Sequence, residues 1–331
     1  MVSPSFEPEA IDLAVLREMY RDGAVNLVGI DPRINATRVA RSLRIGRSRV
    51  AARMRWWRSS GFLRSYAVWV NPALFGWQAG WVAVRLAHHR EKPALFERLK
   101  LIDGVVSAIE FLGEWVSVAI VAPDAATFHR RLELLRHFAG VVEVDTPMPW
   151  SLPEPKRPLS SLDLRVVRAL RERPEAALHD TARRVGISTR TMTRKYAALL
   201  DELAIWFVPV FDFRVFSRPV VALTLFLRPH ASREGVAAEV RKHYPLTLPA
   251  GPGGGESPEH LTTFVILPSA AHQEELERFA AGLPEVAALE SYLLVRFYDY
   301  PEWFDRLVSA RDPSPGGSDR RPRPADARRD R

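Results

Sequence analysis

The sequence predicts an α+β protein made of two similar halves, each with short helices followed by a βαββαβ segment. Two observations carry this prediction: an internal repeat, and the order of helical and strand periodicities within each copy. A third, arginine concentrated in one helical segment, points to the function of the helices. The 331 residues suffice for about two domains, and a hydrophobic content of 47% excludes wholesale disorder.

The internal repeat is visible at two places in each half. A helical apolar pattern around Asp12 matches one around Asp163, and residues 40–45 match residues 182–187. The offset is 151 residues at the aspartates and 142 at the second match, so the first copy carries a longer connection between its first two helices. We therefore expect the same fold in both halves.

The order of elements after the helices is also shared. It is strand, helix, strand, strand, helix, strand, which is the ferredoxin-like pattern. In the first half these elements are expected at residues 77–86, 93–101, 105–111, 115–121, 125–138 and 141–146. In the second half they are expected at residues 220–227, 233–243, near 246, and at 261–267, 270–280 and 286–297.

One uncharged stretch, residues 65–84, has the length of a membrane span. Asn71, Pro72, Gly76 and Gln78 interrupt it. Two strands around a turn explain the stretch better, and we expect no membrane partner.

Positive charge is concentrated in one segment of the chain. There are 47 basic and 39 acidic residues, a net charge of +8, and 42 of the basic residues are arginine. Residues 32–66 hold ten arginines and no acidic residue, whereas residues 67–150 are nearly balanced. Because arginine suits phosphate and guanine, this asymmetry indicates nucleic-acid binding. The alternative is a solvated basic face in an arginine-rich protein.

Apolar residues of the basic segment lie at helical spacing. Val50, Met54 and Trp57 form one stripe, so Arg49 and Arg53 are expected to face a DNA groove. The second copy repeats the pattern with less charge. The residues expected at the DNA are Arg47, Ser48, Arg49, Arg53, Arg55, Arg58 and Arg64 in the first copy, and Thr189, Arg190, Thr191, Arg194 and Lys195 in the second.

The sequence shows no signal of a metal centre or an enzyme. There is no cysteine, which excludes disulfides, thiol nucleophiles and cysteine-ligated metals. The nine histidines form no triad or metal spacing, and the glycine run of residues 251–255 is better explained as an insertion than as a phosphate cradle. We therefore expect no catalytic residue, no cofactor and no enzymatic activity. The N-terminal residues do not form a signal peptide, so a cytoplasmic location is expected.

Residues 182–205, ARRVGISTRTMTRKYAALLDELAI, resemble the helix-turn-helix of the Lrp/AsnC family of transcription regulators. Residues 61–66 and 71–76 are similar to that family's wing and hinge strand. The family joins a winged helix-turn-helix to a βαββαβ ligand-sensing domain, so the resemblance implies a tandem, single-chain form. The implied division is a winged helix-turn-helix at 9–70, a ferredoxin-like sensor domain at 71–150, a linker at 151–158, a second winged helix-turn-helix at 159–213, a second sensor domain at 214–304 and a disordered basic tail at 305–331.

The resemblance also implies a function: sequence-specific regulation of transcription on double-stranded DNA by a covalent pseudo-dimer. Family members form homo-oligomers through their sensor domains and bind amino acids or other small effectors near a loop. Here that loop holds Gly113, Glu114 and Trp115, and Val116 replaces the family's aspartate.

Two alternative functions stay open. Siroheme decarboxylases resemble paired Lrp/AsnC units, but they would need His and Arg on strands that supply neither here, residues 105–111 and the segment near 246. The second alternative is a ligand-sensing module without DNA binding.

Overall fold

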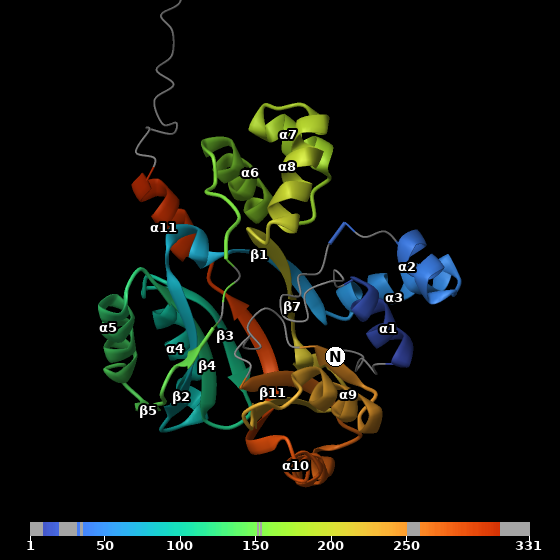
Figure 1. The fold of residues 1–331 in the computed structure, drawn as a ribbon, viewed down its shortest axis with the longest axis vertical. Helices are drawn as coiled ribbons and strands as arrows, with labels where there is room; N and C mark the ends of the chain where they lie inside the picture. Colours follow the sequence, from blue (N-terminus) through green and yellow to red (C-terminus); the bar gives the residue numbers. More distant parts are fainter. Residues whose placement is uncertain are drawn as a thin grey trace, which may run out of the picture.

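The computed structural model describes residues 9–19, 32–33, 36–150, 152, 154–249 and 259–311 of the chain. It is a mixed α+β structure with antiparallel sheets, as predicted (Figure 1). The first half contains α1 (Ala10–Met19), α2 (Ala36–Leu43), α3 (Arg47–Ser59), β1 (Leu63–Val70), η1 (Pro72–Phe75), β2 (Gln78–Leu86), η2 (His89–Glu91), α4 (Lys92–Leu99), β3 (Val105–Phe111), β4 (Trp115–Ala122), α5 (Ala125–Arg136), β5 (Val141–Val144) and β6 (Met148–Pro149). The second half contains α6 (Ser161–Glu172), α7 (Leu178–Val185), α8 (Thr189–Asp201), β7 (Ile205–Phe211), η3 (Phe213–Val215), β8 (Val220–Leu227), α9 (Arg233–His243), β9 (Thr247–Pro249), β10 (His260–Ile266), η4 (Ala270–His272), α10 (Gln273–Ala281), β11 (Val286–Asp299) and α11 (Glu302–Arg311).

The strands form two sheets. The larger has nine strands in the order β5-β2-β4-β3-β11-β8-β10-β9, with β6 also paired to β2. Each half contributes four strands in the same spatial order: fourth, first, third, second. The long strand β11 joins the halves, because its first part pairs with β8 and its last part pairs with β3, where Asp299 lies opposite Ser107. The smaller sheet pairs β1 with β7, so that Val70 lies opposite Ile205.

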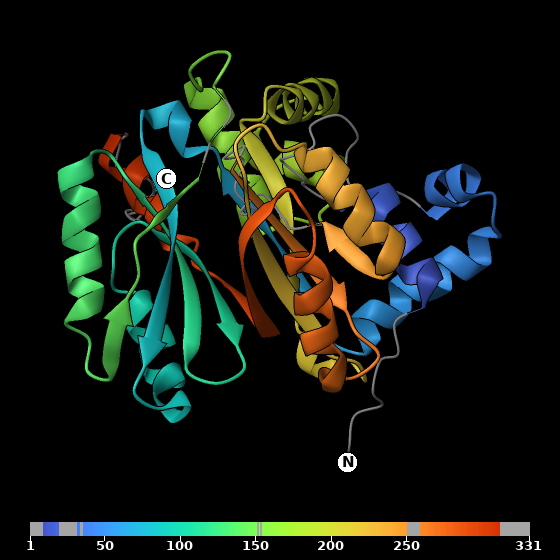
Figure 2. The ribbon, with the colours of Figure 1, turned by 60° about the horizontal axis from the view of Figure 1, so that its bottom comes forward.

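Helices cover one face of the larger sheet in each half. In β2, Val82, Val84 and Leu86 are buried in a core shared with α4 and α5, while Trp81 and Ala83 lie on the other face. In the second half β8 alternates in the same way and packs against α9 and α10. Figure 2 shows these helices on the outside of the two halves. The opposite faces of both halves turn toward the β1–β7 sheet.

Three helices precede the strands in each half. We call α1–α3 the first helical unit and α6–α8 the second helical unit; both project from the sheets (Figure 1). The expected apolar stripes are buried, with Val50 and Trp57 in α3 and Met192, Tyr196 and Leu199 in α8. Since most of the stability of short helices comes from packing such a stripe, this pattern explains why these segments are helical.

The turn before the third helix differs between the halves. Gly186 ends α7 with φ of 75°, a left-handed conformation that favours glycine, and Arg44 has φ of 54° at the matching place. The Ser188 hydroxyl accepts the Thr191 backbone N–H at 3.2 Å and caps α8, whereas Gly46 gives α3 no side-chain cap. The second turn is therefore the more standard of the two.

The uncharged stretch that raised the membrane question is folded into β1, η1 and β2. Asn71 is buried there; its side chain accepts the Ala73 backbone N–H at 3.0 Å and donates to the Leu203 carbonyl at 3.2 Å. Across the described ranges, no helix combines the length and apolar character needed to cross a membrane.

The C-terminal boundary differs from the expected one. A disordered tail was expected from residue 305, but α11 continues to Arg311. Phe304 and Val308, one helical turn apart, are buried against the second helical unit and the β1–β7 sheet. The folded chain therefore continues to Arg311 and does not end at residue 304, which corrects the expected boundary. With only ten residues, α11 is too short for a helical periodicity to stand out in the sequence. The glycine run at 251–255, the rest of the tail, and most of the longer connection in the first copy lie outside the described residues.

Candidate functional site

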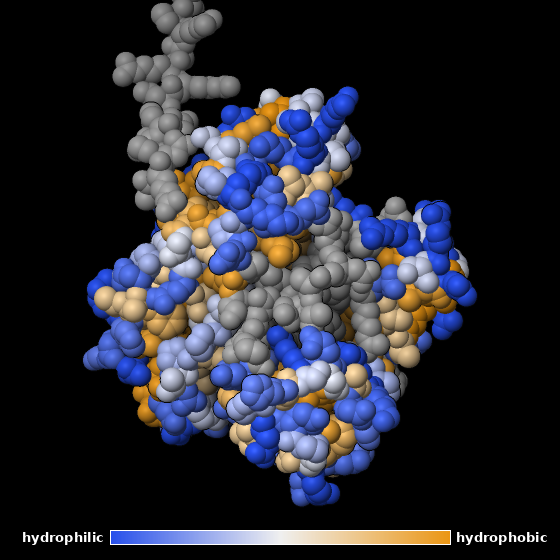
Figure 3. Space-filling model, in the orientation of Figure 1, coloured by the Kyte–Doolittle hydropathy of each residue, from blue (hydrophilic) through white to orange (hydrophobic). Residues whose placement is uncertain are grey.

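The first helical unit presents an arginine-rich helix. Arg47, Ser48, Arg49 and Arg55 are exposed on α3, and α3 contains no acidic residue. Figure 3 shows hydrophilic residues on the projecting surfaces of both helical units. These guanidinium groups are in a position to contact the phosphates or base edges of a duplex.

Arg53 has a different role from the one that the helical spacing predicts. Its Nε donates to Asp12 Oδ1 at 2.7 Å, its Nη2 pairs with Asp12 Oδ2, and its Nη1 lies 2.9 Å from Glu9. Asp12 is only 1% exposed and also accepts the indole N–H of Trp57 at 2.7 Å. The hydrogen bond to Asp12 is the main cause that raises the pKa of Arg53. Arg53 therefore holds α3 to α1, and the expectation that it faces a groove is corrected.

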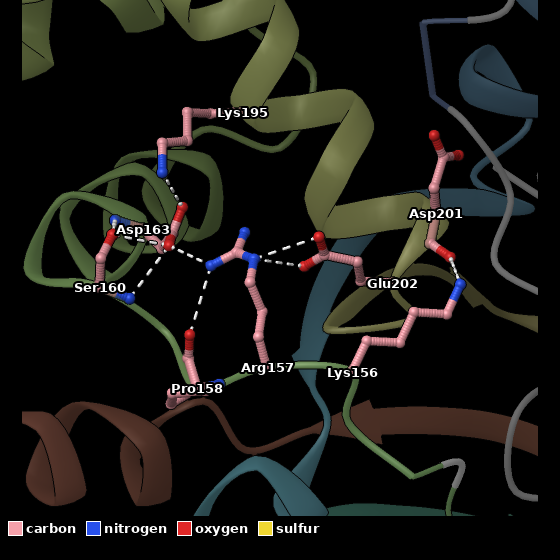
Figure 4. Close-up of polar contacts among 8 residues, drawn as sticks. All are labelled: Lys156, Arg157, Pro158, Ser160, Asp163, Lys195, Asp201 and Glu202. Atoms are coloured by element: carbon pink, nitrogen blue, oxygen red, sulfur yellow. Dashed lines mark hydrogen bonds and ion pairs between the residues drawn. The ribbon is translucent and has the colours of Figure 1, made fainter.

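The second helical unit has the same contact at the matching place. Lys195, 142 residues after Arg53, places its Nζ 2.9 Å from Asp163 Oδ1 (Figure 4). Arg157 and Ser160 donate to the same carboxylate at 2.8 and 2.7 Å. Burial alone would raise the pKa of Asp163, but the hydrogen bonds from Ser160, Arg157 and Lys195 outweigh it and hold this pKa well below its usual range. Lys195 is thus also a structural residue.

Two more of the predicted DNA contacts are engaged within the chain. Arg58 forms an ion pair with Glu175, in the loop between α6 and α7, and so links the two helical units. Arg64 places Nη1 3.7 Å from Asp212, which Arg214 also binds. Both arginine side chains are 55% exposed, so they remain accessible to solvent.

The second helical unit presents fewer positive charges on α8. Thr189, Arg190 and Arg194 are exposed, whereas Thr191 is half-buried. The Thr191 hydroxyl lies 3.0 Å from the Ser188 hydroxyl, within the N-terminal cap. The exposed arginines, rather than Thr191, are the side chains of α8 that are most available to a partner.

The predicted effector residues lie at the β3–β4 hairpin. Gly113 has φ of 84°, which this turn requires of glycine. The Trp115 ring centroid lies 6.0 Å from that of Tyr292, and the Arg85 guanidinium lies 5.9 Å from the Trp115 ring. Glu114 is exposed. These contacts explain Gly113 and Trp115 as parts of the hairpin, and effector binding at this loop stays a prediction.

A cavity of about 590 Å³, which we call the central cavity, lies between the two sheets. Its walls come from β1 and β7 on one side and from both halves of the nine-stranded sheet on the other. Nine aromatic side chains of the described residues contribute to the lining, among them Trp69, Trp81, Phe226, Tyr292 and Tyr298. A mostly apolar space of this volume is typical of a small-molecule site.

The charged groups of the central cavity are acidic. Asp145, Glu290 and Asp299 line it together with His260. No lysine or arginine is found among the described residues of its lining, although the chain has 42 arginines. The cavity therefore has the opposite charge to that of the protein as a whole.

Burial shifts the ionisation of these acidic groups. It raises the pKa of Asp299 to about 6, although the Trp69 indole N–H, which donates to Asp299 Oδ1 at 3.0 Å, opposes the shift. Burial and then Asp145 raise the pKa of Glu290, and burial and then Glu143 raise that of Asp145. Burial and the neighbouring carboxylates raise the pKa of Tyr292 to about 12. Such shifts are common at functional sites.

No pattern in the sequence predicts the central cavity. Its lining residues come from several strands that are far apart in the chain, so no short motif marks it. One trace exists: Thr224 interrupts the otherwise apolar strand β8, and its hydroxyl lies 3.1 Å from that of Thr262 on the cavity side. Among the described residues there is no group of three or more carboxylate or imidazole side chains that could hold a metal ion.

No protein-family model and no curated protein matches the sequence. Solved structures resemble its fold. Siroheme decarboxylase NirDL, crystallised with an iron-uroporphyrin III analogue, is 14% identical, covers 91% of this chain and 99% of its own, and has a TM-score of 0.49. AsnC from E. coli is 13% identical over 47% of this chain and 99% of its own (TM-score 0.32), and LrpA from Mycobacterium tuberculosis is 22% identical over 43% of this chain and 92% of its own (TM-score 0.30).

These neighbours are of two kinds. The AsnC/Lrp regulators align with less than half of the chain, whereas the siroheme decarboxylase aligns with most of it. The expectation that this protein is not an enzyme was wrong, because the structure of an enzyme aligns with 91% of the chain.

Proposed function

We propose that this protein is a ligand-responsive, sequence-specific DNA-binding regulator that carries two DNA-binding units on one chain. The observation that carries the proposal is the set of exposed arginines on α3, Arg47, Arg49 and Arg55, within a helix that has no acidic residue. Such a concentration of guanidinium groups on a projecting helix is the electrostatic pattern of a DNA-binding surface.

The proposal gives each part of the fold a role. The two helical units, followed by β1 and β7, act as winged helix-turn-helix domains, and the four strands and two helices after them act as ferredoxin-like sensor domains. The exposed residues Arg47, Ser48, Arg49 and Arg55 contact one half-site, with Arg190 and Arg194 at the other. Because these two sets differ, we expect half-sites that are not identical.

Salt-dependent duplex binding tests this proposal. If about six phosphates are neutralised, the logarithm of the association constant falls against the logarithm of salt concentration with a slope of about −5. We expect the double variant Arg47→Ala/Arg55→Ala to reduce that slope by about two. Arg278→Ala on α10, which removes an exposed arginine paired with Glu274, is the matched control and leaves it unchanged. A slope near zero for the wild-type protein on specific and random duplexes contradicts DNA binding.

The second candidate function is catalysis in the central cavity. The observation that favours it is Asp299, a cavity carboxyl whose pKa of about 6 suits a general acid near neutral pH. Decarboxylation of a tetrapyrrole would require the cavity to hold many carboxylates, and its described lining offers them no lysine or arginine. For this reason we rank catalysis below DNA binding as the proposed function.

Incubation with siroheme, followed by mass spectrometry, tests the second candidate. Enzymatic activity predicts products that have lost CO₂, and their formation should be slowed by Asp299→Asn. An unchanged siroheme mass after prolonged incubation with the wild-type protein contradicts this activity.

A further inference from the structure

We propose that the central cavity binds an organic cation: an aromatic or aliphatic body with a positively charged group placed between Asp145 and Glu290. The proposal rests on the proposed function in one respect, since it takes the central cavity as the effector site. It names the chemical class of the effector, a class unlike the amino acids that the family resemblance implies.

The charge of the cavity is the first argument. Asp145, Glu290 and Asp299 all line it, and no lysine or arginine does so among the described residues. Asp145 lies close enough to Glu290 to make the ionisation of Glu290 less favourable, which is a repulsion between the two carboxylates. A bound cation would relieve this repulsion, because an opposite charge stabilises the ionised form of both groups.

The aromatic walls are the second argument. Trp81, Phe226, Tyr292 and Tyr298 line the same space as the carboxylates. Aromatic ring faces attract cations, and the attraction increases when the cation is removed from water. Aromatic rings and carboxylates around one cavity therefore favour an amphipathic cation over either a neutral hydrocarbon or an anion.

Unpaired polar atoms in the lining are the third argument. Trp81 is 6% exposed, and its buried Nε1 has no hydrogen-bond partner among the described residues. The buried Nδ1 of His260, also in the lining, has none there either. A buried donor without an acceptor destabilises the protein, so the indole N–H of Trp81 points to a ligand that also carries a hydrogen-bond acceptor.

A pair of probes with the same shape and opposite charge tests the proposal. Tetraphenylphosphonium and tetraphenylborate are titrated separately into the full-length protein by calorimetry, and their one-to-one binding isotherms are compared. We expect tetraphenylphosphonium to bind at least tenfold more tightly. Equal affinities, tighter binding of the borate, or no binding of the phosphonium would overturn the proposal.

Two conservative variants locate the binding. Asp145→Asn and Glu290→Gln should each weaken phosphonium binding at least fivefold, while Glu274→Gln on α10, an exposed carboxylate outside the cavity, should not change it. Circular dichroism checks that each variant is folded. Folded Asp145 and Glu290 variants with wild-type affinity would overturn the proposal. If a variant does not fold, the comparison of tetraphenylphosphonium with tetraphenylborate on the wild-type protein still tests the proposal.

Duplex binding by the same preparations separates this proposal from the proposed function. Phosphonium binding without salt-dependent duplex binding supports the cavity proposal and contradicts DNA binding. Duplex binding with no preference for the phosphonium overturns the cavity proposal alone.

Discussion

The indole N–H of Trp69 donates a hydrogen bond to the carboxylate of Asp299 at 3.0 Å. Trp69 belongs to β1 and Asp299 ends β11, so this bond joins the two sheets that enclose the central cavity. Arg171 of α6 stabilises the ionised form of Asp299 and donates to the Val68 carbonyl at 3.3 Å. One continuous set of contacts therefore runs from the cavity wall to the second helical unit.

The first prediction concerns the pH dependence of stability. Because the folded-state pKa of Asp299 is raised to about 6 from an ordinary value of 3.8, the folded protein binds this proton more tightly than the unfolded chain does. Stability should therefore fall as the pH rises from about 4 to 6, by up to about 3 kcal/mol from this group. Asp299→Asn should remove this component. Urea unfolding of both proteins at several pH values measures it, and parallel pH profiles would contradict it.

The second prediction separates structural from exposed arginines on α3. Arg53→Ala should lower the free energy of unfolding by about 3 kcal/mol, because it leaves the buried Asp12 carboxylate without its cation. Arg49→Ala should leave the unfolding midpoint unchanged and weaken duplex binding. Chemical denaturation and fluorescence anisotropy, applied to both variants, test the pair. Equal stability losses in the two variants would contradict the assignment.

The third prediction concerns the two half-sites. An arginine bound to guanine through two hydrogen bonds is worth about 1–3 kcal/mol of discrimination, whereas a phosphate contact does not depend on sequence. Arg49→Ala should therefore relax base preference in one half-site, and Arg190→Ala in the other. Arg64→Ala, on β1, should weaken binding to all duplex sequences equally. Binding-site selection with each variant is the measurement, and an unchanged motif for Arg49→Ala and Arg190→Ala would show that these helices are not the readers.

The fourth prediction is that cation binding weakens in acid. Burial raises the pKa values of Asp145 and Glu290, so both should become protonated at a higher pH than ordinary carboxyl groups. Glu143, beside Asp145, adds to the upward shift, and Arg85 opposes it. The affinity for tetraphenylphosphonium, which does not titrate, should fall as the pH is lowered from 8 to 4.5.

The charge of His260 must be separated from this effect. His260 gains a proton over the lower part of that range, since burial lowers its pKa, and a positive charge in the cavity would also repel the probe. The titration is therefore repeated with His260→Gln. The same pH dependence in that variant assigns the effect to the carboxyl groups of the cavity, which include Asp299 with its pKa of about 6, and its disappearance assigns it to His260.

The periodicities of the sequence were enough to predict the element order and the buried stripes. Val50 and Trp57 in α3, and Met192 in α8, are buried as their spacing predicts. Val82 and Val84 in β2 alternate with residues of the other face. Helical and strand periods are local properties, because they depend only on which face of an element meets the core. The sequence therefore determined the mixed α+β fold, the shared order of the two halves and the ten arginines around α3.

The tertiary structure alone decided how the charged residues are used. Arg53 binds Asp12 of α1, 41 residues away in the sequence. Arg58 binds Glu175, which follows α6 and is 117 residues away. The carboxylates Asp145, Glu290 and Asp299 line one cavity only because β11 joins the halves. A local pattern shows which face of an element is apolar but not which distant side chain will meet a given charge. That pairing depends on chain topology, so the internal ion pairs and the acidic central cavity became visible only in three dimensions.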